Sequence, residues 1–159
     1  MPDILIVPFR RELAPAFQQL NLDWIERLFM VEEADRKVLG DPERAIIAPG
    51  GQIYFALDGS DPVGTVAMLR VAPQRYELAK MAVAPSHQRR GIGAMLGAAG
   101  IAFARGAGAA SVFLLTNSRL FGAIRLYERL GFRRAPDPDA PEYARADVYM
   151  ELPIRGPTG

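Results

Sequence analysis

Apolar side chains recur at two different spacings along the chain, and the change of spacing separates predicted helices from predicted strands. An apolar run at residues 4–9 predicts an edge strand, a place where Pro8 is tolerated. Leu13, Phe17 and Leu20 then recur at the spacing of one helical face. The chain is therefore expected to enter a helix directly after its first strand.

A second helix is predicted to begin at Asp23, because Asp23 and Glu26 have the spacing of a capping box. Its buried stripe is either Trp24, Leu28 and Val31, or Ile25 and Phe29. Gly40 is expected to end the helical region, and the pair at 41–42, Asp followed by Pro, to begin a short helical turn.

Beyond residue 52 the apolar positions alternate, which is the period of a half-buried strand. Strands predicted over 53–57 and 63–71 form a hairpin around the polar loop between them. A third strand is predicted over 76–83. Simple alternation would place Glu77 on one face with Ala79, Met81 and Val83, and Lys80 on the other face with Leu78 and Ala82.

The second half of the chain alternates between helical and strand patterns. A helix is predicted from Ile92 to Gly106 or Gly108, a buried strand over 111–116, and a helix over 120–130 closed by Gly131. Short strands at 132–134 and 147–152 flank a Pro-rich loop. We expect residues 1–152 to form a single domain and residues 153–159 a flexible tail.

Composition excludes several classes of protein. The 159 residues have the length of one globular domain, and they include no Cys and a single His, His87. Disulfide frameworks, Cys/His zinc sites and thiol catalysis are therefore excluded, and we expect no metal. The longest uncharged helical stretch, 91–104, is shorter than the roughly 20 residues that span a bilayer. We expect a cytoplasmic protein with no membrane partner.

Charge is distributed unevenly although the net charge is only +1, a value that argues against a nucleic-acid partner. Between residues 89 and 134, 8 Arg accompany a single acidic residue, Glu128, which indicates an anion-binding half. Between residues 12 and 43, 8 acidic residues accompany 3 basic ones. That acidic segment either attracts a cation or forms the solvated faces of helices.

The segment from 83 to 94 has the pattern of an anion site. A strand and a short turn lead to a basic pair and to Gly91-Ile92-Gly93 at the start of a helix. Unpaired amides at a helix N-terminus attract anions, and glycine lets a phosphate approach the backbone closely. The pattern lacks the later acid of a dinucleotide fold and the lysine of a Walker A loop. Glycines at these positions are equally expected where a helix packs closely on a sheet.

The order of a strand, the QRRGIGA helix, a strand and the AIRLYERLGF helix resembles the GNAT superfamily of acyl-CoA N-acyltransferases over residues 52–134. The resemblance implies an α+β fold: a GNAT-like mixed, mostly antiparallel sheet that is splayed in the middle and flanked by helices on both faces. It also implies acetyl-CoA as co-substrate, with the pyrophosphate on the amides of 89–94 and the pantetheine arm along the strand before them. The implied contacts are Met81, Ala82, Val83, Gln88, Arg89, Arg90, Gly91, Ile92, Gly93, Ala94, Asn117 and Tyr127. Asn117 lies three residues before the position at which the family carries its Asn, so its contact is left open.

Two residues are candidates for proton transfer. An alkylammonium with a pKa near 10.4 must lose a proton before it attacks a thioester, and burial of a carboxylate on an apolar face favours its use as a base. Glu77 is therefore the candidate general base, whereas Lys80 is expected in a salt bridge. Tyr127 matches the family's tyrosine that protonates the departing thiolate, so it is the candidate general acid.

Several alternatives accompany this interpretation. A hydrolase triad of Ser86, His87 and an Asp is rejected, because neighbouring side chains in such a turn should point apart and because no nucleophile-elbow sequence is present. An acyl-CoA sensor without catalysis and a protein N-terminal or lysine acetyltransferase stay open. Acidic residues in 24–43 and 136–143 predict a small cationic amine or a basic peptide as the acceptor. The oligomeric state, a homodimer included, is also open.

Overall fold

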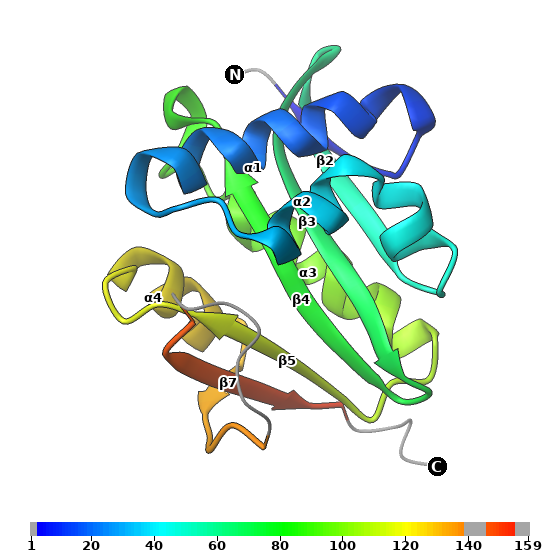
Figure 1. The fold of residues 1–159 in the computed structure, drawn as a ribbon, viewed down its shortest axis with the longest axis vertical. Helices are drawn as coiled ribbons and strands as arrows, with labels where there is room; N and C mark the ends of the chain where they lie inside the picture. The colour runs from blue at the N-terminus through cyan, green and yellow to red at the C-terminus, as the bar shows by residue number, and fades with distance from the viewer. Residues whose placement is uncertain (1–2, 139–145, 155–159) are drawn as a thin grey trace.

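The computed structural model describes residues 3–138 and 146–154, which fold around one seven-stranded sheet (Figure 1). In spatial order the strands are β1 (Ile4–Pro8), β2 (Gln52–Asp58), β3 (Asp61–Ala72), β4 (Arg75–Val83), β5 (Ser111–Thr116), β7 (Val148–Pro153) and β6 (Arg133–Arg134). Neighbouring strands are antiparallel except for β4 and β5, which are parallel. The mixed, mostly antiparallel sheet expected from the sequence is confirmed.

Helices cover both faces of the sheet, as the α+β interpretation predicts. On one face lie α1 (Ala14–Leu28), α2 (Glu33–Gly40) and a π-helical turn, η2 (Glu43–Ile47); on the other lie α3 (Ile92–Gly106) and α4 (Phe121–Arg129) (Figure 1). Each face has its own apolar core. Phe17, Ile25 and Phe55 belong to the first core, and Leu96 and Tyr127 to the second.

The predicted helix start at Asp23 is wrong, because α1 continues without interruption to Leu28. The Asp23 carboxylate accepts a hydrogen bond from Gln19 Nε2 at 2.7 Å, one turn earlier on the exposed face, and does not cap a helix. The capping box is found at the start of α2, where the carboxylate of Asp35 accepts the Glu32 amide at 2.8 Å. The predicted helix end at Gly40 is confirmed.

A β-bulge in β4 overturns the predicted assignment of its faces. Thr65 pairs with Ala82 but Ala67 pairs with Ala79, so two residues of β4 lie opposite one residue of β3. Lys80, at the bulge, has a left-handed φ of +55°. The extra residue reverses the alternation beyond it.

Simple alternation predicts that Glu77, Met81 and Val83 share one face of β4, and because of the bulge they do not. Glu77 pairs with Leu69, which packs in the core under α1 and α2. Lys80 also lies on that face, because its ammonium reaches Asp35 of α2. Met81 and Val83 pack instead against the core under α3 and α4. Glu77 thus shares a face with Lys80 and not with Met81 and Val83.

The C-terminal boundary of the folded domain lies later than predicted. Pro153 belongs to β7, and Ile154 is buried with its amide donating to the Ala110 carbonyl at 2.8 Å. The sequence pattern places Pro153 and Ile154 in the flexible tail. The ordered chain extends further because the apolar side chain of Ile154 reaches the core. Residues 155–159 lie outside the described residues. Within the described ranges, no helix combines the length and the apolarity needed to cross a membrane.

Candidate active site

A cavity of about 260 Å³ opens where the sheet splays between β4 and β5. These strands are paired only from Arg75 to Glu77 on β4 and from Ser111 to Phe113 on β5. Beyond these pairs the strands diverge, as Figure 1 shows. The described lining consists of Trp24, Leu28, Phe29, residues 77–83, Gln88, residues 115–117, Leu120, Ala123, Tyr127 and Ala146. The expected splay in the middle of the sheet is therefore present and forms a site.

Both candidate catalytic residues line this cavity, and they come from opposite sides of it. Glu77 is the last β4 residue paired with β5, whereas Tyr127 comes from α4. Tyr127 is 7% exposed and packs edge-on against Phe132 with ring centroids 6.2 Å apart. Burial raises the pKa of Tyr127 to about 12, so the phenol is protonated at neutral pH. The cavity thus combines a carboxylate with a phenol that can donate a proton.

Gly91 and Gly93, the two glycines of the predicted anion site, occupy their positions for different structural reasons. Gly91 is the N-cap of α3 with a left-handed φ of +76°, and a Cβ there would meet nothing within 4 Å. A Cβ on Gly93 would lie 2.9 Å from Leu126 Cδ2 of α4. Gly91 therefore leaves open space at the start of the helix, whereas Gly93 permits close packing of α3 against α4. A packing explanation therefore holds for Gly93, but its neighbour is the helix α4 and not the sheet expected from the sequence.

The other predicted contacts divide between the cavity and the turn beside it. Met81, Ala82, Val83, Gln88, Asn117 and Tyr127 line the cavity. Arg89, Arg90 and Gly91 are exposed in the turn before α3, and Ile92 places its side chain in the core. Ala94 follows in the first turn of α3. Gln88 joins the two groups, because its Nε2 donates to the Val83 carbonyl at 3.1 Å.

Asn117 organises a loop next to the cavity. Its Oδ1 accepts the Arg119 amide at 2.9 Å and the Arg119 Nε at 3.4 Å. The guanidinium of Arg119 then lies 4.8 Å from the centre of the Phe29 ring, at the end of α1. Asn117 therefore helps to link the loop after β5 to the wall formed by α1.

The geometric reason for rejecting a triad at Ser86 and His87 is wrong. Ser86 Oγ lies 2.7 Å from His87 Nδ1, and His87 Nε2 lies 2.8 Å from Asp58 Oδ2. The short 3₁₀ turn η3 (Pro85–His87) brings the two neighbouring side chains together. None of these three residues belongs to the described lining of the cavity. Their contacts tie the end of β2 to the turn that precedes the candidate anion site.

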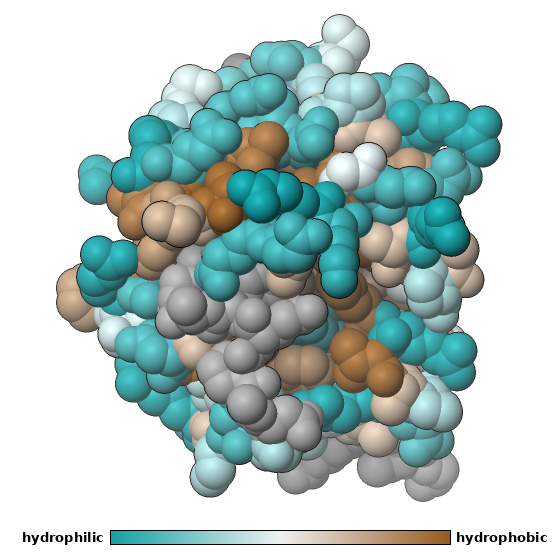
Figure 2. Space-filling model, in the orientation of Figure 1, coloured by the Kyte–Doolittle hydropathy of each residue, from teal (hydrophilic) through white to brown (hydrophobic). Residues whose placement is uncertain are grey.

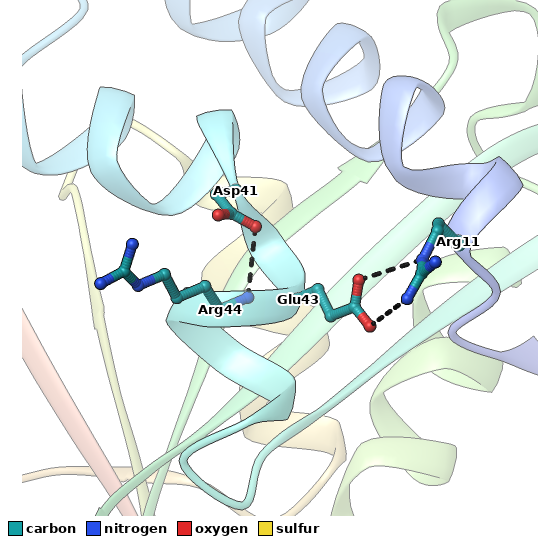
Figure 3. Close-up of polar contacts among 4 residues, drawn as sticks. All are labelled: Arg11, Asp41, Glu43 and Arg44. Atoms are coloured by element: carbon teal, nitrogen blue, oxygen red, sulfur yellow. Dashed lines mark hydrogen bonds and ion pairs between the residues drawn. The ribbon is translucent and has the colours of Figure 1, made fainter.

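Sequence reasoning missed an apolar wall of the cavity and predicted an acidic one. In the segment 24–43 the lining residues are Trp24, Leu28 and Phe29. Three acidic residues of this segment form ion pairs within the protein: Glu33 with Arg36, Asp35 with Lys80, and Glu43 with Arg11. Figure 3 shows the last contact, together with Asp41 accepting the Arg44 amide at 3.3 Å. Of the second predicted acidic segment, Asp139 and Glu142 lie outside the described residues.

Lys80 forms the predicted salt bridge, and the structure identifies its partner. The ammonium lies 2.7 Å from Asp35 Oδ1, and the two side chains are 6% and 0% exposed. The Asp35 carboxylate also caps α2. One buried ion pair therefore joins the bulge of β4 to the helix that covers it.

Comparison with known proteins identifies the family to which this fold, with its splayed sheet, belongs. Residues 9–132, more than half of the chain, match the model of the acetyltransferase (GNAT) family. The chain belongs to this family.

Individual relatives and solved structures are similar to the chain at low identity. The uncharacterized N-acetyltransferase YvbK of Bacillus subtilis is 30% identical over 102 residues, which cover 62% of this chain and 66% of YvbK, just under two thirds of its length. A GNAT acetyltransferase structure from Staphylococcus aureus Mu50 superposes with a TM-score of 0.88 at 20% identity, covering 96% of this chain and all of that one (100%). A Bacillus subtilis acetyltransferase solved with CoA has a TM-score of 0.73 at 21% identity, covering 96% and 100%. These structures support the fold.

Proposed function

We propose that the protein transfers the acetyl group of acetyl-CoA directly to a primary amine, with Glu77 as general base and Tyr127 as general acid. The observation that carries this proposal is the cavity at the splay, which Glu77 and Tyr127 line from opposite sides. Membership of an acetyltransferase family supports the same reaction.

The residues around the splay fit an acyl-CoA. Past Glu77, β4 has no partner strand on its β5 side in the described chain, so backbone groups of Met81 and the N–H of Val83 are available to the amides of a pantetheine arm, whereas the Val83 carbonyl already accepts from Gln88. The open N-terminus of α3 at Gly91 suits a pyrophosphate, with Arg89 and Arg90 exposed beside it. When bound, acetyl-CoA supplies a thioester that an amine nitrogen can attack.

Proton transfers then follow from the two side chains. Glu77 accepts a proton from the acceptor ammonium, which leaves a neutral nitrogen that forms the new C–N bond as the C–S bond breaks. Tyr127 donates its proton to the departing sulfur, which leaves as the thiol. The nitrogen loses its second proton as the amide forms, and that proton restores the Tyr127 phenol. A phenol with a pKa of about 12 is a weak acid, but burial in the same cavity also raises the basicity of a thiolate. A backbone amide of β4 can donate to the carbonyl oxygen as negative charge develops there.

The proposal is tested with Glu77→Gln, which keeps the shape of the side chain and removes its basicity. We expect kcat for thiol release from acetyl-CoA to fall by roughly 10² to 10⁴, because the acceptor ammonium loses its general base. The calorimetric Kd for acetyl-CoA should not change. The matched control is Glu128→Gln, since Glu128 is an exposed carboxylate on α4 that does not line the cavity.

Two outcomes would contradict the proposal. Full turnover by Glu77→Gln would remove Glu77 as the base. Tight binding of acetyl-CoA by the unaltered protein, without thiol release for any amine, amino acid, polyamine or peptide, would favour an acyl-CoA sensor.

A further inference from the structure

The apolar wall of the cavity gives information about the acceptor that the candidate catalytic residues do not give. It is formed by Trp24, Leu28 and Phe29 at the end of α1, three side chains without charge. We propose that the preferred acceptor is a primary amine with an apolar substituent, aromatic or branched, that packs on this wall. This inference rests on the proposed acetyl transfer.

The wall is a fixed and largely apolar surface, to which Trp24 adds a buried indole N–H that has no hydrogen-bond partner among the described residues. Trp24 and Phe29 pack edge to face, with ring centroids 6.0 Å apart and planes at 87°. On the side of the β5–α4 loop, Arg119 stacks on Phe29, and Asn117 holds Arg119 in place. Rings held in this way present a shape that a flat or branched substituent can match without ordering the protein further.

Part of this surface is still exposed and available to a ligand. Leu28 lines the cavity yet is 54% exposed. Figure 2 shows apolar surface gathered over the C-terminal end of α1, whereas much of the surrounding surface is hydrophilic. A substituent that covers Leu28 removes apolar surface from water, which favours binding in proportion to the area covered. A small amine such as ethylamine would leave that surface exposed.

The described charges of the cavity disfavour an anionic acceptor. Among the described lining residues, Glu77 is the one carboxylate and Lys80 the one ammonium. The Lys80 ammonium lies 2.7 Å from Asp35 Oδ1. A carboxylate on the acceptor would be repelled by Glu77 and would compete with Asp35 for Lys80.

The described acidic residues that predicted a small cationic amine or a basic peptide as acceptor do not line the cavity. Glu43 accepts hydrogen bonds from Arg11 on the outer side of η2 (Figure 3), and Glu33 pairs with Arg36 on α2. Neither Glu33 nor Glu43 lines the cavity. Their field at an exposed surface is screened within about 8 Å at physiological ionic strength, so it acts weakly on a bound acceptor.

The first experiment compares acceptors at fixed acetyl-CoA, with kcat/KM measured by thiol release. The panel is 2-phenylethylamine, ethylamine, phenylalanine, spermidine and a lysine-containing peptide. We expect 2-phenylethylamine to exceed each of the others by at least about tenfold, because it alone combines an apolar group large enough to cover the wall with no carboxylate and no second charged or polar group. A fastest reaction with spermidine, the peptide or phenylalanine would overturn the acceptor inference and leave acetyl transfer intact. Absence of thiol release with every amine would overturn both.

The second experiment changes the wall itself. Leu28→Ser should lower kcat/KM for 2-phenylethylamine roughly fivefold, since about half of a leucine side chain remains to be covered by the substrate. The loss of kcat/KM for ethylamine should be smaller, because ethylamine does not reach the wall, and the Kd for acetyl-CoA should not change. Met30→Ser is the matched control, because Met30 is 82% exposed on the same segment and does not line the cavity. Its effect should stay within about twofold.

A charge at the same position gives a readout that a structural defect would not give. Leu28→Asp adds a carboxylate to the wall, so the ratio of kcat/KM for spermidine to that for 2-phenylethylamine should rise by at least about tenfold. Equal losses for both acceptors, or equal effects of Leu28→Ser and Met30→Ser, would show that the wall does not contact the acceptor and would overturn the inference.

Discussion

The buried ion pair between Lys80 and Asp35 makes a prediction about stability that the structure allows to be worked out. Lys80 Nζ lies 2.7 Å from Asp35 Oδ1, and neither side chain is more than 6% exposed. Lys80→Met would leave a buried carboxylate without its ammonium, and Asp35→Asn would leave a buried ammonium without its carboxylate. Each single substitution is therefore expected to destabilise the fold strongly.

Removing one partner of a buried pair costs about 3–5 kcal/mol. For a domain of this size each kcal/mol lowers Tm by about 2–4 °C, so each single variant should lose about 6–20 °C. In the double variant both charges are absent, and the asparagine introduced by Asp35→Asn keeps a side-chain carbonyl near the Glu32 amide. We therefore expect the double variant to lose less than the sum of the single losses, with a coupling free energy of about 2–3 kcal/mol.

The assay is urea unfolding of the unaltered protein, both single variants and the double variant, followed by circular dichroism. Arg36→Met is the matched control, because its ion pair with Glu33 is exposed, 3.7 Å long and only one turn apart. That variant should lose less than about 0.5 kcal/mol. The reasoning would be refuted if the losses of unfolding free energy for Lys80→Met and Asp35→Asn sum to the loss of the double variant within about 0.5 kcal/mol. Independent sites behave in that way.

Two further predictions concern the co-substrate site and the phenol. Gly91→Asp and Gly91→Asn impose the same side-chain shape at a positive φ that both residues tolerate, but only Asp adds a charge where the pyrophosphate is expected. Gly91→Asp should therefore bind acetyl-CoA at least about tenfold more weakly than Gly91→Asn by calorimetry, and equal affinities would remove the anion site. Tyr127→Phe should lower kcat by roughly 10² if the phenol protonates the thiolate, and an unchanged kcat would exclude that role. Because burial raises the pKa of Tyr127 from 10.0 to about 12, its protonated form stabilises the fold fully below pH 10, and this stability is lost as pH rises through about 12. The loss is about 3 kcal/mol, and urea unfolding at several pH values should show it in the unaltered protein and not in Tyr127→Phe.

The parts of the site that could be predicted from sequence are those specified by nearby residues. The start of α3 at Gly91 follows from a strand, a basic turn and glycine within a short segment. Tyr127 follows from the resemblance of the AIRLYERLGF segment, which lies largely on α4, to a family motif. In both cases the signal and the structure that it predicts lie within about one helix length of chain.

The predictions that were wrong concern residues whose structural partners lie far away in the sequence. The bulge at Lys80 accompanies an ion pair with Asp35, 45 residues earlier, and nothing in the alternation of β4 indicates it. Asp23 and Asp35 both resemble the acid of a helix start, and only the tertiary structure shows that Asp35 has that role. The pattern around Trp24 predicts a helix core and not a cavity wall, because a helical stripe does not reveal that sheet strands diverge beneath it.

The bulge also explains how one strand can serve two substrates. Without it, Glu77, Met81 and Val83 would lie on the same face of β4. With it, Glu77 lies on the face of α1 and α2, beside the apolar wall, whereas Met81 and Val83 lie on the face of α3, whose N-terminus carries Gly91. The proposed base is thus on the side of the acceptor and the proposed acyl-CoA contacts are on the side of the anion site. Because Asp35 neutralises Lys80, the one ammonium among the described lining residues, the contact that accompanies the bulge also weakens the repulsion that an acceptor cation would meet beside Glu77.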